Sequence, residues 1–174
     1  MNTVLRALEP DDLDFLFVLE NDPELWAVSE VLPAPLSRHA LREYLRHAAA
    51  SLAETGQLRL IIKGKDGQAV GTLDLYDYNA RHQRAGVGVA VLQSERRRGY
   101  AQAALAALLP YARQALHLHQ LYCTIAQGNQ ASIRLFAKSG FRRVGIRQDW
   151  LRRNTENNWE NAVEMQLLLT NLEE

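Results

Sequence analysis

Residues 87–101 constrain the fold more than any other part of the chain, because a strand, a basic turn and a helix follow one another without a gap. The segment 87–92 (VGVAVL) has the apolar pattern of a mostly buried strand. A polar turn with three consecutive arginines and Gly99 comes next, and a helix is predicted from Tyr100. A buried strand that leads directly into a helix predicts a sheet with helices packed on it.

The rest of the chain supplies more elements of both kinds. Strands are predicted at residues 4–8, 58–63, 69–78, 121–125, 142–147 and 163–169. Helices are predicted to open at residues 10–12, to run from the N-cap Ser37 through about residue 53, to start at Tyr100 and to span residues 131–138. Pro110 should kink the third helix or end it early. Residues 26–35 are expected to be an irregular connection.

This order of elements predicts the α/β class, with a mixed sheet of six or seven strands and helices on both faces. The chain of 174 residues shows no repeat, low-complexity tract or linker, so one domain over residues 1–174 is expected. Acidic and basic residues balance at 20 each, which argues against a general nucleic-acid binder. We expect no membrane segment and a cytoplasmic location.

Metal chemistry has little support in the sequence. Cys123 is the single cysteine, so neither a disulfide within the chain nor a cysteine-based zinc site is expected. It lies in an apolar strand pattern and is interpreted as a packing residue. His117 and His119 are two residues apart at a helix end, where they do not share a face, so a solvated terminus is expected.

The turn before Tyr100 has the features of a phosphate site. A helix start offers unpaired N–H groups, glycine permits close approach, and arginines add positive charge. A solvated basic turn explains the same features equally well. The chain has no P-loop, and Gly86-x-Gly88 is followed by Val91 where a dinucleotide fingerprint needs glycine.

Two motifs carry a resemblance to a known family. Residues 96–101 (RRRGYA) match Arg/Gln-x-x-Gly-x-Gly/Ala, and residues 129–141 (NQASIRLFAKSGF) match Asn-x-x-Ala/Ser-x-x-Leu-Tyr/Phe-x-x-x-Gly-Phe. With them the chain resembles the GCN5-related N-acetyltransferases (GNAT), and within these the spermidine and ribosomal-protein acetyltransferase branch. Residues 161–165 (NAVEM) fit that branch as well.

The resemblance implies a site for acetyl-CoA between two splayed parallel strands, residues 87–92 and 121–125. The pantetheine arm should pair with the backbone of Val89, Ala90 and Val91 like an added strand. The pyrophosphate should lie at Arg96, Arg97, Arg98, Gly99, Tyr100 and Ala101. Asn129 and Ser132 match positions that bond the pantetheine or the phosphates, although helix capping is a compatible alternative.

Two positions depart from the family pattern. Phe136 stands beside the expected thioester, where many relatives have a tyrosine that protonates the departing thiolate. Gly86 stands where relatives often have a glutamate that acts as general base. Neither residue can move a proton, so the resemblance leaves the acid and the base unassigned.

The acceptor should bind near residues 73–78 (LDLYDY). Alternation puts Asp74, Tyr76 and Tyr78 on one side of this strand, and Asp74 and Tyr76 are also the catalytic candidates. Carboxylates beside aromatic rings suit a cationic amine, although solvated acids and packed tyrosines on an edge strand are the plainer explanation. Further candidates are Asp77, Trp26, Glu30 and Tyr44. Asp149, Trp150 and Trp159 are expected to form a packed aromatic corner at a dimer contact or a pocket rim.

The sequence therefore predicts an N-acetyltransferase that moves an acetyl group from acetyl-CoA to a primary amine in a ternary complex. The acceptor would be a polyamine-like small amine or a protein N-terminus, and a homodimer is possible. A non-catalytic acyl-CoA-binding module is the alternative, favoured by Phe136 and Gly86.

Overall fold

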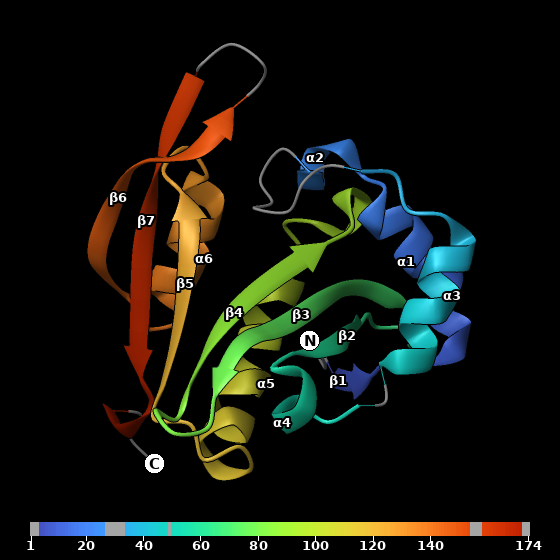
Figure 1. The fold of residues 1–174 in the computed structure, drawn as a ribbon, viewed down its shortest axis with the longest axis horizontal. Helices are drawn as coiled ribbons and strands as arrows, with labels where there is room; N and C mark the ends of the chain where they lie inside the picture. The colour runs from blue at the N-terminus through green and yellow to red at the C-terminus, as the bar shows by residue number, and fades with distance from the viewer. Residues whose placement is uncertain (1–3, 27–33, 49, 154–157, 172–174) are drawn as a thin grey trace.

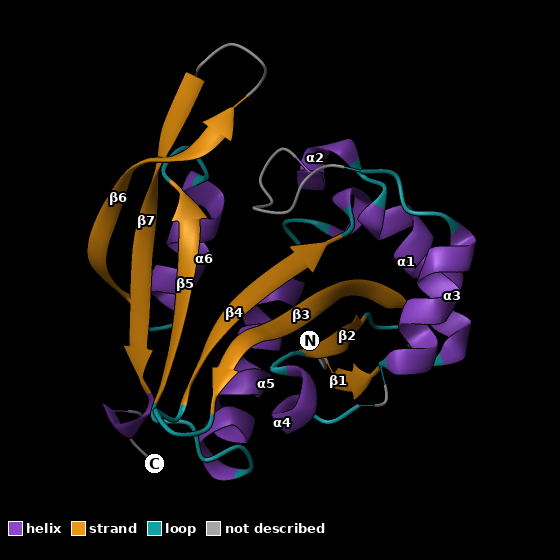
Figure 2. Ribbon diagram, in the orientation of Figure 1, coloured by secondary structure: helices purple, strands orange, loops and turns teal. Residues whose placement is uncertain are grey.

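A seven-stranded sheet forms the centre of the molecule (Figures 1 and 2). The computed structural model describes residues 4–26, 34–48, 50–153 and 158–171. Across the sheet the strands follow the order β1-β2-β3-β4-β5-β7-β6, and every neighbouring pair is antiparallel except β4 and β5. The strands are β1 Val4–Ala7, β2 Leu58–Lys63, β3 Ala69–Asn79, β4 Arg84–Val91, β5 Gln120–Ala126, β6 Arg142–Arg153 and β7 Asn158–Leu168. The predicted mixed sheet is confirmed.

Six α-helices accompany the sheet among the described residues. They are α1 Leu13–Glu20, α2 Pro23–Trp26, α3 Arg38–His47, α4 Leu52–Thr55, α5 Tyr100–Gln114 and α6 Gln130–Lys138. In Figure 1, α5 lies behind β3 and β4, α6 lies behind β5, and α1 and α3 lie at the other end of the sheet. No described helix is long and apolar enough to cross a membrane.

The core lies between α5 and the sheet. Alternate residues of β3 and β4 face α5, and its own buried residues recur at helical spacing. Leu73, Leu75, Val87, Leu105 and Leu108 are at most 1% exposed. At about 1.5–3 kcal/mol for each large apolar side chain, this burial fixes the position of the α5 N-terminus relative to β4.

Packing also explains why α5 continues past Pro110 to Gln114. Of the two predicted outcomes, a kink or an early end, the early end is wrong. A proline inside a helix costs about 3 kcal/mol. Leu108 and Ala112, on either side of Pro110, are fully buried, and this burial offsets the cost.

The predicted long helix after Ser37 is wrong at its end. Ser37 caps α3 by accepting a hydrogen bond from the N–H of Ala40 at 3.1 Å, as expected. However, α3 ends at His47, and Ser51 opens the separate α4 through a capping box with Glu54. The N-cap at Ser51 therefore divides the predicted helix into two.

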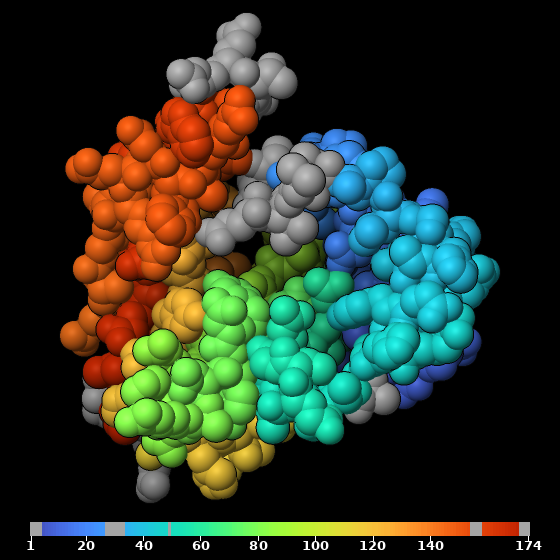
Figure 3. Space-filling view, in the orientation of Figure 1, coloured from blue at the N-terminus to red at the C-terminus, as the bar shows by residue number. Residues whose placement is uncertain are grey.

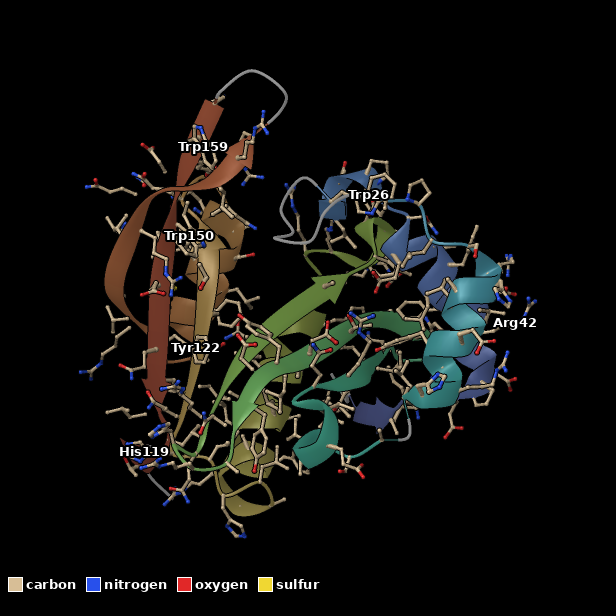
Figure 4. The ribbon with its side chains drawn as sticks, viewed as in Figure 1. Trp26, Arg42, His119, Tyr122, Trp150 and Trp159 are labelled. Carbon is tan, nitrogen blue, oxygen red and sulfur yellow. The ribbon has the colours of Figure 1, made fainter. Side chains whose placement is uncertain are left out.

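The last two strands are longer than predicted and form an arm that extends past the end of β5 (Figure 1). A register shift between Arg147 and Leu151 interrupts their pairing, with Asp149 in a left-handed conformation. The predicted packed corner is wrong, because Trp150 and Trp159 are 48% and 47% exposed along this arm (Figure 4).

The parallel pair β4 and β5 separates along its length. Only three residue pairs join the strands, from Arg84↔Gln120 to Gly86↔Tyr122. Beyond Gly86, β4 continues to Val91 and β5 to Ala126, and the two strands no longer pair with each other. Figure 1 shows them diverging from their shared end. The predicted splay is confirmed, and it leaves one edge of β4 unpaired.

Candidate active site

The loop between β4 and α5 is shaped to hold an anion. Arg97 and Gly99 both have left-handed backbones, with φ values of 62° and 84°. Such residues in a turn point successive N–H groups into a concavity that suits an anion. Gly99 is the N-cap of α5 and has no side-chain acceptor, so it leaves the first-turn N–H groups of the helix available.

The three arginines of this loop differ in their contacts. The guanidinium of Arg96 donates to Glu24 on α2 at 2.7 Å and to the carbonyl of Val91 at 3.1 Å. Its side chain is therefore directed at α2 and β4. Arg97 and Arg98 are exposed, and Arg98 pairs with Glu95 at 3.1 Å.

Backbone groups of β4 alternate between β3 and the gap. The N–H of Leu92 donates to the carbonyl of Val70 at 2.9 Å, and the register pairs Ala90 with Thr72. Hydrogen-bonded pairs in an antiparallel ladder recur at every second residue, so Ala90 also bonds to β3. Val89 then points both of its backbone groups into the gap, and Val91 points its N–H there, because the Val91 carbonyl accepts a hydrogen bond from Arg96.

The helix α6 begins beside the open end of β5. The side chain of Asn129 accepts a hydrogen bond from the N–H of Ser132 at 3.1 Å, which is the capping arrangement. Phe136 is 4% exposed, and its ring packs edge-to-face on Phe141 with centroids 5.0 Å apart. The aromatic ring is thus part of the core.

Three aligned residues cross the sheet at the closed end of the gap. Tyr76 pairs with Gly86 on β4, and Gly86 pairs with Tyr122 on β5. The two rings are 6.1 Å apart, edge to face. A Cβ atom on Gly86 would lie 2.2 Å from the Tyr76 ring, so this ring fills the space that a glutamate at position 86 would need.

Tyr122 brings a hydroxyl group to this end of the gap, and Figure 4 shows its position on β5. The hydroxyl donates a hydrogen bond to the carboxylate of Asp77 at 3.3 Å. Burial, together with the charge of Asp77, raises the pKa of Tyr122 above its usual value. The phenol therefore keeps its proton at neutral pH.

Asp74 is engaged with a residue that sequence reasoning missed. Arg59 lies opposite Asp74 on β2 and donates to both carboxylate oxygens, at 2.6 and 3.1 Å. Arg59 also donates to the carboxylate of Glu20 on α1. Both carboxylates raise the pKa of Arg59 in spite of its burial, so the guanidinium stays charged.

Tyr78 lies on the opposite face of β3 from the predicted one. Asp77 has a φ of 49°, and the register shifts by one residue between Tyr76 and Asn79. This bulge turns Tyr78 toward the core, where it packs half-buried. The alternation prediction therefore holds for Asp74 and Tyr76 and is wrong for Tyr78.

The remaining acceptor candidates are dispersed. Trp26 ends α2, and its indole N–H donates to the carbonyl of Glu20 at 2.7 Å. Glu30 lies outside the described residues. Asp77 is exposed beside Tyr122. The structure brings together Tyr76, Tyr122 and Asp77 at the closed end of the gap.

A cavity of about 460 Å³ lies on the face of the sheet that carries Asp74 and Tyr76, and both residues line it. Its walls come from the end of α3, the segment around α4, and β2 and β3. It is lined by Leu8, Tyr44, His47, Ala48, Ala50, Thr55, Gln57, Leu58, Arg59, Asp74, Leu75 and Tyr76. In Figure 3 the residues of α3 and α4 (cyan and teal) and of β3 (green) adjoin on the face toward the viewer. A small organic molecule fits such a volume.

Cys123 has the surroundings of a packing residue. Cys123 is buried on β5, and burial raises the pKa of its thiol to about 12. Among the described residues, no three His, Cys, Asp or Glu side chains are grouped as a metal site would need.

Comparison with known proteins shows the family. The model of the acetyltransferase (GNAT) domain matches residues 2–142, and the chain belongs to this family. It is therefore an acetyltransferase enzyme with acetyl-CoA as its co-substrate, and the resemblance inferred from the two motifs is confirmed.

The chain is similar to an uncharacterized N-acetyltransferase and to spermidine N-acetyltransferases. It is 27% identical over 144 residues to the prophage-derived uncharacterized N-acetyltransferase YokL of Bacillus subtilis, covering 83% of this chain and 78% of YokL. It is 23% identical over 137 residues to the spermidine N(1)-acetyltransferase of Vibrio cholerae, covering 79% and 77%. The crystal structure of the Vibrio cholerae spermidine N-acetyltransferase with CoA and spermine has a TM-score of 0.86 at 22% identity, covering 97% and 96%.

Proposed function

We propose that this enzyme transfers the acetyl group of acetyl-CoA directly to a primary amine while both substrates are bound. The amine would be a polyamine, a similar small amine or a protein N-terminus. The observation that carries the proposal is the unpaired edge of β4, which leads from the closed end of the gap to the N–H groups around Gly99. An extended molecule with a diphosphate at one end and a thioester at the other fits this edge.

The polypeptide backbone supplies most of the cofactor contacts in this proposal. Val89 and Val91 would pair with the pantetheine arm, and the N–H of Val89 would polarise the thioester carbonyl. The loop at Arg97 and Gly99 would hold the pyrophosphate. Asn129 and Ser132 would contribute polar contacts from the start of α6.

The reaction needs one bond to form and one to break. The neutral amine attacks the carbonyl carbon, a C–N bond forms and the C–S bond breaks. The amine loses one proton, and the thiolate gains one to become free CoA. Because thiols titrate near pH 8.5, the CoA thiolate is a stable leaving group and positioning can supply much of the acceleration.

Tyr76 and Tyr122 are the groups best located to assist this transfer. Gly86 lies between them and offers no base, and Phe136 offers no acid. The Tyr122 hydroxyl, protonated at neutral pH, would relay a proton to the thiolate directly or through water. Tyr76 would hold the cationic amine against its ring. Asp74 would act through its charge, because Arg59 holds both of its oxygens.

The family assignment argues against the alternative expected from the sequence, a non-catalytic acyl-CoA-binding module. It is favoured by the absence of an ionisable side chain at Gly86 and of a hydroxyl at Phe136. The same cofactor contacts would serve it, so cofactor binding alone does not separate the two functions.

The deciding experiment measures release of the CoA thiol from acetyl-CoA with a panel of primary amines. Turnover with any amine supports the enzyme, and intersecting initial-velocity lines support the ternary complex. Parallel lines would contradict direct transfer. Tight acetyl-CoA binding without turnover across the panel would favour the module. Tyr122→Phe should lower kcat about tenfold or more with unchanged acetyl-CoA affinity.

A further inference from the structure

We propose that Arg59 is a specificity determinant that makes the acceptor cavity select a small amine with one positive charge and an apolar body over a polyamine. This inference rests on the proposed function, because it names the acceptor class of the same site. It comes from the pairing of charges beside the cavity, which the sequence motifs do not show.

Both carboxylates at this place are held by the same guanidinium. Arg59 binds Asp74 through two hydrogen bonds and Glu20 through a third. The three side chains are each about one quarter exposed, so solvent screens the cluster only in part. Arg59 also lies over the ring of Tyr44, with its guanidinium carbon 5.6 Å from the centroid.

The cluster therefore offers little negative charge to a ligand. Two carboxylates and one guanidinium leave a net charge of one negative unit. Burial raises the pKa of the Tyr44 phenol, so this ring adds no charge at neutral pH. One ammonium group balances such a cluster. Asp74 is the only carboxylate among the described residues that line the cavity, so a further ammonium group of a polyamine would lack a partner there.

The other cavity walls strengthen this preference. Leu8, Ala48, Ala50 and Leu58 contribute apolar surface. Moving an ammonium group from water to such surface without a hydrogen-bonding partner is strongly unfavourable. A hydrocarbon body would instead gain from its burial there.

The cavity lies next to the proposed reaction centre. Asp74 and Tyr76 line it, and on the neighbouring strand they pair with Gly88 and Gly86. Adjacent strands are about 4.8 Å apart, so the unpaired edge of β4 lies one strand away. The Tyr76 ring covers Gly86 between the two. An amine with its body in the cavity can thus reach the β4 edge across this ring.

The test compares kcat/KM for hexylamine, spermidine and a short peptide with a free N-terminus. The wild-type enzyme should prefer hexylamine to spermidine by about tenfold or more, because a single charge-assisted contact changes affinity by that order. A preference for spermidine or for the peptide would overturn the inference and leave the proposed function intact. No turnover with any amine would instead refute the proposed function.

Arg59→Gln should shift the ratio of hexylamine to spermidine toward spermidine by about tenfold or more, since it frees two carboxylates. The matched control is Arg153→Gln, which removes an arginine–glutamate pair on the β6–β7 arm and should leave the ratio unchanged. An unchanged ratio in a folded Arg59→Gln enzyme would overturn the role of Arg59.

If Arg59→Gln fails to fold, Glu20→Gln provides a second variant. It does not leave two carboxylates without their guanidinium partner. It removes the net negative charge of the cluster while Asp74 remains paired. The KM for hexylamine should rise about tenfold with little change in the KM for acetyl-CoA. An unchanged KM for hexylamine would contradict the inference.

Discussion

The proposed cofactor side and the proposed acceptor side of this enzyme differ in the groups that form them: one is mainly backbone, the other mainly side chains. The cofactor side consists mainly of backbone groups: the unpaired edge of β4 and the N–H groups around Arg97 and Gly99. The acceptor side consists of side chains that hold one another, with Arg59 between Glu20 and Asp74.

The two sides should therefore differ in which substitutions they tolerate. A backbone site depends on conformation, so glycine and left-handed positions matter there more than charged side chains. A site made from paired side chains depends on which partners meet, so a single substitution alters its charge. The predictions below test this contrast.

Gly99→Glu should give the largest effect. It places a side chain at a φ of 84° and a carboxylate at the proposed pyrophosphate site, so acetyl-CoA affinity should fall at least about 100-fold. Calorimetry measures this affinity. Gly67→Glu is the matched control, because Gly67 has a φ of 82° in the β2–β3 turn, away from the site. Equal affinity in the Gly99 variant would place the cofactor elsewhere.

Gly86→Ala should disturb the acceptor side through Tyr76. The new Cβ would meet the Tyr76 ring at 2.2 Å, so the ring must move, and the free energy of unfolding should fall by about 2 kcal/mol. Gly88→Ala is the control, because its Cβ would be 3.9 Å from the same ring. Urea denaturation compares the two variants. An equal free energy of unfolding in the two variants would mean that the Tyr76 ring can move without loss of stability.

Arg96→Gln should have a small effect for a residue inside the signature motif. Its guanidinium pairs with Glu24, a partly exposed contact worth about 0.7 kcal/mol, so the KM for acetyl-CoA should rise about threefold at unchanged kcat. Glu24→Gln should match it, and the double variant should add nothing. A loss as large as that of Gly99→Glu would show that Arg96 binds the cofactor itself.

Phe136→Tyr should change activity least. The ring is 4% exposed and packs on Phe141, so the added hydroxyl would lack solvent and cost about 1 kcal/mol of stability. Acetyl-CoA affinity and kcat should stay within a factor of two. Steady-state kinetics and urea denaturation measure both quantities. A clear rise in kcat would show that protonation of the thiolate limits the rate.

The sequence predicted the fold because it depends on local patterns, and the loop proposed to bind the cofactor has the predicted order of elements. A buried strand, a glycine turn and a helix start are adjacent in the chain, and the structure has them at residues 84–114. The loop arginines were predicted as one group, yet Arg96 faces α2, because its partner Glu24 lies on an element distant in the sequence.

The acceptor side was harder to predict because it depends on pairing between distant elements. Arg59 meets Asp74 only through the β2–β3 register, and Glu20 reaches Arg59 from α1. Tyr78 was misplaced because a bulge at Asp77 reverses the alternation. The position of Tyr122 could have been predicted from the sequence. In β5 it alternates with the buried Leu121 and Cys123, which places it on the opposite face.

The short contact between β4 and β5 has a consequence for dynamics. Three residue pairs join two otherwise separate half-sheets, so a bound chain in the gap would tie these halves together. Amide hydrogen exchange should then slow at Val89 and Val91, which face the gap, and change little at Ala90, already bonded to β3. Along β4, amide exchange would thus slow at every second residue when a ligand occupies the gap.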